Sequence, residues 1–299
     1  MSTLPGGALS PVTLEPQAGS GGSTRRARAR EIARGLRRSK TFLVGAGIVG
    51  FWILDALLWP VFVPYDPQAT LFQPSVEPNG TTWFGTDDLG RDVFSRVLAG
   101  ATPVLTVAPA ATLLGVTGGV IVGLTAGYLR GRVDDVLMRL VDAFLAFPLI
   151  ILAVLVLATF GPSTLNVILV IGIVFTPLVA RTVRSVVLVE REREYVAAAR
   201  MRGERAPYIM FGEILPNVSG PILVETTIRF GYAIFTSATL SFLGLGIQQP
   251  SPDWGLTIAL SRGSMAVQPW TVLFPALALA TLVVGVNLLA DGLKRALED

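Results

Sequence analysis

The chain has 299 residues, of which 52% are hydrophobic and 15% charged; its mean hydropathy is +0.62 and its net charge is +3. Soluble domains carry about 25% charged residues, so this composition indicates several membrane spans. Cysteine and histidine are both absent, which excludes disulfides, thiolate nucleophiles, the usual Cys/His zinc sites and histidine acid–base chemistry. We expect no metal site and no cofactor on this chain.

Residues 1–40 are predicted to form a disordered, basic cytoplasmic tail. Residues 1–24 are rich in Gly, Ser, Pro and Thr, a composition typical of disorder. A basic run follows, made of Arg25, Arg26, Arg28, Arg30, Arg34, Arg37, Arg38 and Lys40. Because an apolar stretch begins directly after it, this run indicates an anchor at the bilayer surface, and we expect no nucleic-acid partner.

Residues 41–299 are predicted to form one all-α membrane domain with six transmembrane helices. The first stretch, 42–63, would be about 33 Å long as a helix, enough to cross a hydrocarbon core of about 30 Å. It is too long for the apolar region of a signal peptide, so we expect an uncleaved span. Five more apolar stretches follow it, at 97–128, 143–160, 165–180, 221–246 and 271–290.

The distribution of positive charge orients these helices. With a cytoplasmic N-terminus, 20 of the 24 Lys and Arg residues fall in inside segments, three fall outside, and Arg229 lies within a span. The positive-inside rule therefore predicts that both termini are cytoplasmic. External loops are expected at about 65–96 and 247–270.

Four glycines at a spacing of four residues mark the second predicted span. On a helix this spacing forms one smooth stripe that allows another backbone to approach closely. We interpret the stripe as a helix-packing surface, made of Gly115, Gly119, Gly123 and Gly127.

Three ionisable residues fall within the predicted spans, where charges are costly and often functional. Glu225 and Arg229 are four residues apart and can pair on one helix face; a structural ion pair and a contact with substrate are both open. Asp55 has no partner in its own segment. It lies late in the first span, where it either reaches water or serves a function.

The cytoplasmic loop 181–220 contains the string EYVAAARMRGERAPYIMFGEILPN at 194–217. Its first part favours a short helix over 194–205, which Gly203 and Pro207 then end. One face of this helix is predicted to carry Tyr195, Ala198, Ala199 and Arg202. Such a helix is either an ordinary surface helix or a docking element for a soluble partner.

This loop closely resembles the signature loop of the permease subunits of bacterial ABC importers. That signature runs Glu-Ala-Ala, three residues, Gly, then about nine residues before Ile…Leu-Pro. Ala197 stands where the signature has Glu, and the rest of the frame is present. The resemblance implies a coupling loop at about 190–217 that docks on an ATPase subunit and contains Glu194, Tyr195, Ala197, Ala198, Ala199, Arg202, Gly203, Ile214, Leu215 and Pro216.

Three more segments resemble the C-type subunit of the dipeptide/oligopeptide/nickel permease group. They are WFGTDDLGRDVFSRVLAGA at 83–101, GRVDDVLMRLVDAFLAFP at 131–148, which is similar to the group's first cytoplasmic loop, and LSFLGLGIQQPSPDWG at 240–255. The resemblance extends over about 40–297. Ser237 is a departure, because many members carry an acid there.

The resemblance implies a type I ABC importer permease fold in the inner membrane of a bacterium. The expected partners are a homologous B-type permease, two ATPase subunits or one fused double ATPase that bind ATP and Mg, and an extracytoplasmic solute-binding protein. The expected function is the import of di- or oligopeptides, with nickel or another small solute as the alternative.

Two other classes of protein are weaker interpretations. A secondary transporter often has inverted repeats and ion sites at the midplane, and we find no repeat here. A membrane enzyme needs catalytic groups, but the chain has no Walker A motif and no defensible catalytic arrangement. We therefore expect a subunit without catalytic residues, whose partners hydrolyse ATP.

Overall fold

The computed structural model describes residues 34–298, which are mostly helical, with loops between the helices and one isolated bridge, between Thr86 and Asp92. The predicted disorder of residues 1–33 lies outside the described residues. Residues 34–38 were expected to belong to the disordered tail, but they form a helical turn. Ser39 then caps the first long helix by accepting a hydrogen bond from the Phe42 amide at 3.3 Å.

Short helices alternate with long ones along the chain. The elements are α2 (Lys40–Phe62), α3 (Val93–Ala99), α4 (Ala101–Leu129), α5 (Gly131–Leu145), α6 (Leu149–Phe160), α7 (Thr164–Glu190), α8 (Glu194–Met201), α9 (Ala206–Tyr208), a π-helix (Ile209–Ile214), α10 (Leu215–Asn217), α11 (Ser219–Phe242), α12 (Trp254–Ser261) and α13 (Trp270–Glu298).

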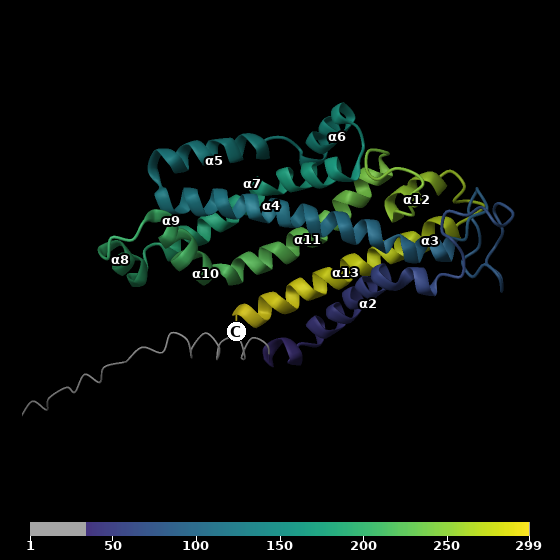
Figure 1. Ribbon diagram of the computed structural model, residues 1–299, viewed down its shortest axis with the longest axis horizontal. Coiled ribbons are helices and arrows are strands. Elements are labelled where there is room, and N and C mark those ends of the chain that lie inside the picture. Colours follow the sequence, from purple (N-terminus) through teal and green to yellow (C-terminus); the bar gives the residue numbers. More distant parts are fainter. Residues whose placement is uncertain (1–33, 299) are drawn as a thin grey trace, which may run out of the picture.

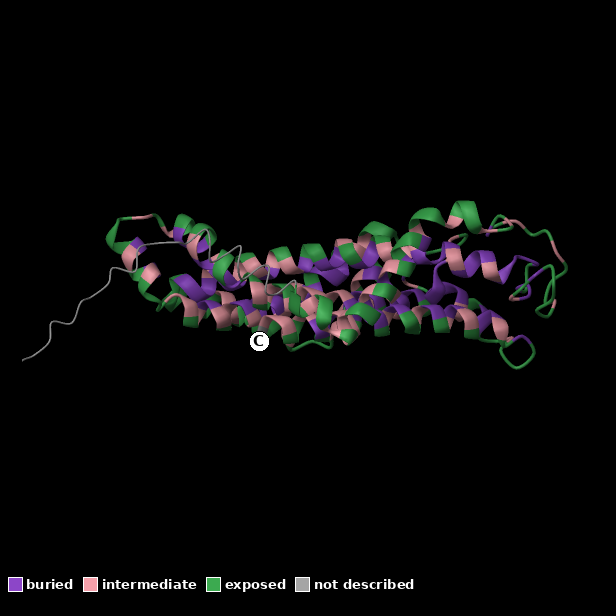
Figure 2. Cartoon of the chain, turned by 90° about the horizontal axis from the view of Figure 1, so that it is seen from below, coloured by how far each residue is buried: buried purple, intermediate pink, exposed green. Residues whose placement is uncertain are grey.

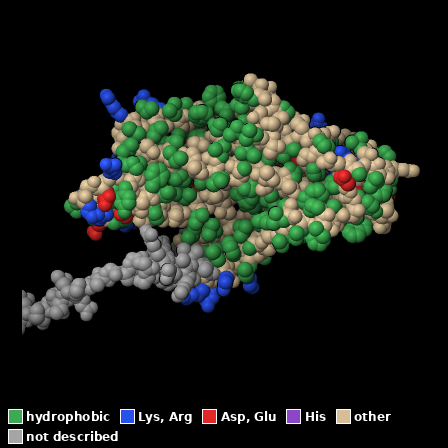
Figure 3. All heavy atoms as spheres, in the orientation of Figure 1, with side chains coloured by type: hydrophobic (Ala, Val, Ile, Leu, Met, Phe, Trp, Pro, Cys, Tyr) green, Lys and Arg blue, Asp and Glu red, His purple; other side chains and the backbone are tan. Residues whose placement is uncertain are grey.

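The long helices form an elongated bundle (Figure 1). Helices α2, α4, α7, α11 and α13 run along its length, α8–α10 lie at one end, and α12 lies at the other with the loop before α3 (Figure 1). Buried residues line the contacts between the long helices (Figure 2). In the face drawn in Figure 3, hydrophobic side chains cover much of the body while charged side chains gather toward its margins, as expected for a bundle with lipid around its middle.

Four helical segments are long and apolar enough to cross a membrane: α2, the α3–α4 run Val93–Leu129, α7, and α13 over Trp270–Leu297. The pair α5 and α6 becomes a fifth if the two helices count as one broken span. Helix α11 has 24 residues, but it carries Glu225 and Arg229 together with several Thr and Ser residues and is not among the four. Polar groups, and not length, separate α11 from the others.

The prediction of one continuous helix over 143–160 is wrong. Helices α5 and α6 meet at a bend of 81°. Pro148 is the N-cap of α6; it has no N–H to donate, and it disfavours a helical conformation for the residue before it. Residues 131–145, within the segment that resembles the group's first cytoplasmic loop, form α5, and ion pairs tie α5 to α7. Arg184 donates to both carboxylate oxygens of Asp134, at 2.6 and 2.7 Å, and Arg181 pairs with Asp142.

Candidate functional site

The candidate site is the loop between α7 and α11, and it rests on the tightly packed pair α4 and α7. The four-residue glycine stripe of α4 faces α7. A Cβ built on Gly119 would lie 2.4 Å from the Cβ of Val179, and one on Gly123 would lie 2.5 Å from the Ala180 carbonyl oxygen. At Gly127 it would lie 2.8 Å from Val187 Cγ1, and at Gly115 it would lie 2.8 Å from Phe175 Cβ. The two helices can approach this closely only because the stripe has no side chains.

Helix α8 is the first element of the loop, and a glycine ends it. Gly203 has φ of +77°, a conformation that costs other residues free energy because of their Cβ atom. Its amide donates to the Arg200 carbonyl at 3.0 Å, and the Glu204 amide donates to the Ala199 carbonyl at 3.2 Å. These two bonds form a Schellman motif. The helix therefore ends at Met201, before the predicted limit of residue 205.

One face of α8 is buried against the bundle. Val196 and Ala199 are both 0% exposed, and they join a cluster that includes Ile209 and Ile214 from the following π-helix and Leu124 from α4. A π-helix commonly marks a functional position, and nothing in the residue pattern predicted one here. Ile214 of this π-helix, which the signature frame had assigned to the coupling loop, is fully buried and packs against the bundle.

Polar contacts fasten the loop to the ends of α4 and α7. The Tyr195 hydroxyl donates to Glu190 Oε1 at 3.0 Å. Burial first, and then this hydrogen bond, raise the pKa of Tyr195 to about 12, so the phenol stays protonated at neutral pH. The Arg200 guanidinium lies 5.2 Å from the centre of the Tyr128 ring of α4, and Arg202 lies 3.4 Å from Glu213. The first two contacts therefore connect α8 to α7 and α4, and the third connects α8 to the π-helix.

The opposite face of the loop is open and partly apolar. Met201 is 84% exposed, Tyr208 is 53% exposed and Phe211 is 46% exposed. The sequence analysis singled out none of these three residues and did not single out the buried Val196. The one feature that could have pointed to Met201 is its position just before Gly203, the residue that ends α8. The remaining assigned residues divide by exposure: Tyr195, Ala198 and Leu215 are half-buried, whereas Glu194, Ala197, Arg202, Gly203 and Pro216 are exposed.

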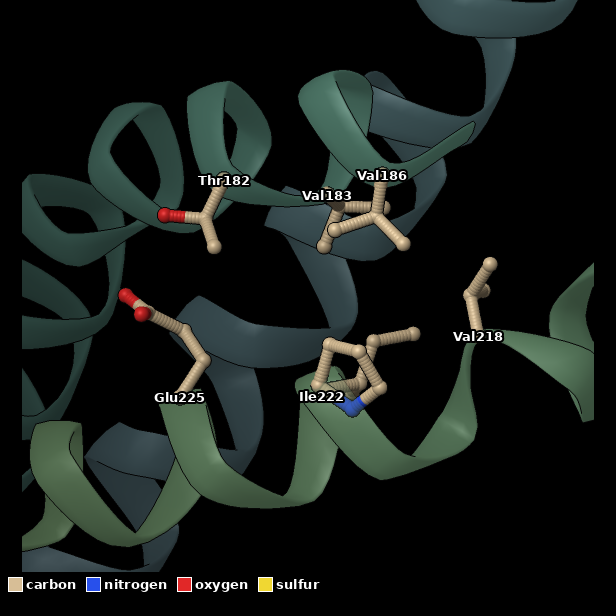
Figure 4. Close-up of a pocket in the computed structure, with 7 residues that line it drawn as sticks. Thr182, Val183, Val186, Val218, Ile222 and Glu225 are labelled. Carbon is tan, nitrogen blue, oxygen red and sulfur yellow. The ribbon is translucent and has the colours of Figure 1, made fainter. Parts of the chain in front are cut away.

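Glu225 and Arg229 form an ion pair within α11. Arg229 Nε donates to Glu225 Oε1 at 2.6 Å, and the two side chains are 16% and 9% exposed. The guanidinium also lies 5.9 Å from the Phe175 ring centre and 5.6 Å from that of Tyr232. Glu225 borders a narrow hollow between α7 and α11, where its carboxylate points toward Thr182 (Figure 4).

Two other polar groups are buried elsewhere in the bundle. Asp55 is 8% exposed, so its side chain does not simply reach water. Its Oδ2 has no hydrogen-bond partner within the described residues. Ser237 is 0% exposed, and within the same residues its Oγ is likewise unpaired. Asp55 belongs to α2 and Ser237 to α11, so neither residue is part of the predicted coupling loop.

The end of the bundle opposite the loop is a closely packed cap. Arg96 is 2% exposed and donates to the carbonyls of Pro67 at 3.1 Å and Ser251 at 3.3 Å. Trp254 of α12 donates to the Val97 carbonyl at 2.8 Å. The carboxylate of Asp253 caps α12 by accepting from the Leu256 amide at 2.9 Å. Burial raises the pKa of Asp253 to about 6. These contacts join the two predicted external loops into one structure.

A bundle of long apolar helices with an anchored, partly exposed loop at one end is typical of a multi-pass membrane protein. Comparison with known proteins agrees. The model of the family "Binding-protein-dependent transport system inner membrane component" matches residues 119–299, and that of the "N-terminal TM domain of oligopeptide transport permease C" matches residues 28–77. The chain belongs to the family of binding-protein-dependent transport system inner membrane components.

Characterised relatives cover nearly the whole chain. The dipeptide transport system permease protein DppC of Alkalihalophilus pseudofirmus is 40% identical, over 90% of this chain and 89% of its own. The di/tripeptide transport system permease protein DppC of Pseudomonas aeruginosa is 36% identical, over 90% and 91%. The glutathione transport system permease protein GsiD of Salmonella typhimurium is 41% identical, over 90% and 89%.

A solved structure shares the fold. A chain of the MetNI methionine ABC transporter in an inward-facing conformation aligns with a TM-score of 0.56 and 19% identity, over 68% of this chain and 96% of that one. The fold is therefore that of a type I ABC importer permease. The resemblance noted from the motifs, to C-type permeases of the peptide group, is confirmed.

Proposed function

We propose that this chain is one permease subunit of an ATP-driven importer of di- or oligopeptides in a bacterial inner membrane. The observation that carries the proposal is the loop at α8: its inner face is fastened to α4 and α7, while Met201 and Tyr208 on its outer face are uncovered. An uncovered apolar surface on a firmly held short helix suits the docking of a soluble subunit. Peptide transport is supported by the names of the relatives.

The proposed topology has six spans with both termini in the cytoplasm. The spans are α2, α3–α4, the bent pair α5–α6, α7, α11 and α13. This assignment places α8 on the same side as both termini and the cap of Arg96 and Trp254 on the other, in agreement with the charge bias. A reporter enzyme inserted near Asn79 should then be active outside the cell, and one fused after residue 299 should be active inside. Opposite locations for the two ends of the chain would refute the six-span count.

In the proposed mechanism this chain and a homologous B-type permease enclose the pathway. Two ATPase subunits, or one fused double ATPase, hold ATP and Mg and dock at residues 190–217, and a solute-binding protein delivers substrate to the external cap. Closure of the ATPase pair displaces α8. Because Tyr195 and Arg200 link α8 to α7 and α4, that movement would reach the helices and switch the cavity between its inward- and outward-facing states.

Reconstituted uptake tests the function directly. The chain, its partner permease, the ATPases and the binding protein are incorporated into proteoliposomes, and uptake of a labelled dipeptide is measured with ATP and with a non-hydrolysable analogue. We expect uptake that requires both ATP and the binding protein. Uptake of nickel chelates but not of peptides would replace the substrate class, and uptake driven by a proton gradient without ATPases would indicate a secondary transporter.

A further inference from the structure

The two ends of the described chain pack against each other. Helices α2 and α13 are in contact through glycines: a Cβ on Gly45 would lie 2.6 Å from the Leu289 amide nitrogen, and one on Gly292 would lie 2.6 Å from the Cβ of Phe42. At the same end of the pair, a Cβ on Gly35 would lie 3.7 Å from the Cβ of Ala296. Residues some 250 positions apart in the chain are therefore neighbours.

This packing gathers six basic side chains at one end of the α2–α13 pair. We call them the terminal basic cluster; all six are exposed, and they are Arg34, Arg37, Arg38, Lys40, Lys294 and Arg295. The acidic residues in the same two segments, 34–40 and 291–298, are only Asp291 and Glu298. Blue side chains project from the bundle near the C-terminal end in Figure 3.

The protein itself does not neutralise most of this charge. Within the described residues, Arg34, Arg37, Arg38 and Arg295 form none of the ion pairs that the structure contains. The favourable effect of cations on a helix C-terminus accounts for positions on α13. It also favours Arg37 and Arg38, which end the helical turn 34–38. It cannot account for Lys40, because Lys40 begins a helix whose first turn contains no acid, and cations are unfavourable there.

We propose that the terminal basic cluster binds the anionic headgroups of phospholipids in the leaflet at which α2 and α13 end. Arginine presents a planar fork of donors that matches the oxygens of a phosphate diester. The surface next to the cluster is suited to acyl chains, because Leu43 and Val44 of α2 are 50% and 54% exposed. A headgroup site directly beside an apolar, lipid-facing helix fits a phospholipid and does not fit a soluble anion or a nucleic acid.

The tertiary contact makes the proposal specific. A basic N-terminal tail acting by itself would need none of the residues from α13, whereas the proposed site draws on both ends of the chain. Removing the two charges of α13 should therefore weaken lipid binding even though all basic residues before α2 remain.

The test uses the full chain, purified with its transport complex and reconstituted in nanodiscs of phosphatidylcholine with a minor fraction of phosphatidylglycerol. The enrichment of phosphatidylglycerol around the protein is measured by the motional restriction of spin-labelled lipid. The variants are Arg34→Gln/Arg37→Gln/Arg38→Gln and Lys294→Gln/Arg295→Gln. We expect the enrichment to fall by about fivefold for each charge removed and to vanish at high salt.

A matched control removes two charges from elsewhere. Arg132 and Arg139 of α5 are exposed, and among residues 34–298 they take part in none of the ion pairs, so Arg132→Gln/Arg139→Gln should leave the enrichment unchanged. Replacing Arg37, Arg38 and Arg295 by Lys should preserve most of it, and equal recovery of complex from each variant excludes misfolding. Wild-type enrichment in the Lys294→Gln/Arg295→Gln variant, or an equal loss in the α5 control, would overturn the proposal.

Discussion

Gly119 of α4 lies so close to Val179 of α7 that a Cβ on the glycine would be 2.4 Å from the Cβ of the valine. No real pair of carbon atoms tolerates that distance, so any side chain at residue 119 forces the two helices apart. Val179 is itself 0% exposed and cannot swing into open space. Among the glycine contacts of the α4–α7 pair, on which the α8 loop rests, this one is therefore the most sensitive to an added side chain.

Replacing Gly119 by Ala should destabilise the protein by about 1–3 kcal/mol, the usual cost of overpacking a tight interface. Thermal stability of the purified complex measures the effect. Gly47→Ala in α2 is the matched control, because a Cβ there has no atom within 4 Å and alanine favours a helix by about 1 kcal/mol over glycine. An equal melting temperature for Gly119→Ala and the wild type would mean that α4 and α7 are not packed as described.

Met201→Asp should uncouple transport from ATP hydrolysis while leaving the complex assembled. The side chain is 84% exposed at the open face of α8, so a carboxylate there disturbs a docked partner and not the interior. The measurement is the stimulation of ATPase activity by the loaded binding protein. We expect this stimulation to fall by about tenfold or more, because docking would lose an apolar contact and bury an unpaired charge. Met201→Leu is the control, since it keeps an apolar side chain of similar volume at the same exposed position. If both variants show normal stimulation, α8 is not the docking surface.

The ion pair of α11 gives a prediction about assembly. Glu225→Ala leaves Arg229 without its partner at 2.6 Å in a mostly buried position, and such a loss typically costs about 3–5 kcal/mol. The double variant Glu225→Ala/Arg229→Ala removes both charges and should recover much of the yield of intact complex. Yield and uptake are measured on the same preparations. Normal yield with poor uptake in the double variant would assign the pair to substrate contact, and no recovery at all would show that the residues act independently.

Asp253 predicts a pH dependence of the external cap. Its pKa is raised by burial from 3.8 to about 6, so the folded protein binds this proton more tightly than the unfolded chain does. Stability from this group is therefore greatest below about pH 4 and declines as the pH rises through 6. Asp253→Asn should be more stable than the wild type above pH 6 and similar to it below pH 4. Asn also caps helices well, so the bond from the Leu256 amide is kept. Identical pH profiles of melting temperature for the two proteins would contradict the prediction.

Properties that depend on composition and on local backbone preference could be predicted from the sequence. The apolar stretch after Lys40 did become α2, because length and hydropathy alone decide whether a segment can cross a bilayer. The stop at Gly203 was also predictable, since a left-handed C-cap requires no partner from elsewhere in the chain. The motif frame around α8 could locate the candidate site in one loop because its residues are consecutive in the chain.

Tertiary structure decided what depends on which faces meet. The glycine stripe predicted a close partner for α4, but only the packing of Gly119 on Val179 identified that partner as α7. The tertiary structure also decided where α5 lies, because Asp134 and Arg184 hold it against α7 before the bend at Pro148. Pro148 and the charges of α5 are visible in the sequence, but neither identifies α7 as the helix against which α5 packs. The meeting of Gly35 with Ala296 likewise arises from the pairing of α2 and α13, since contacts between distant segments depend on the whole arrangement of the bundle and leave no periodic signal in either segment.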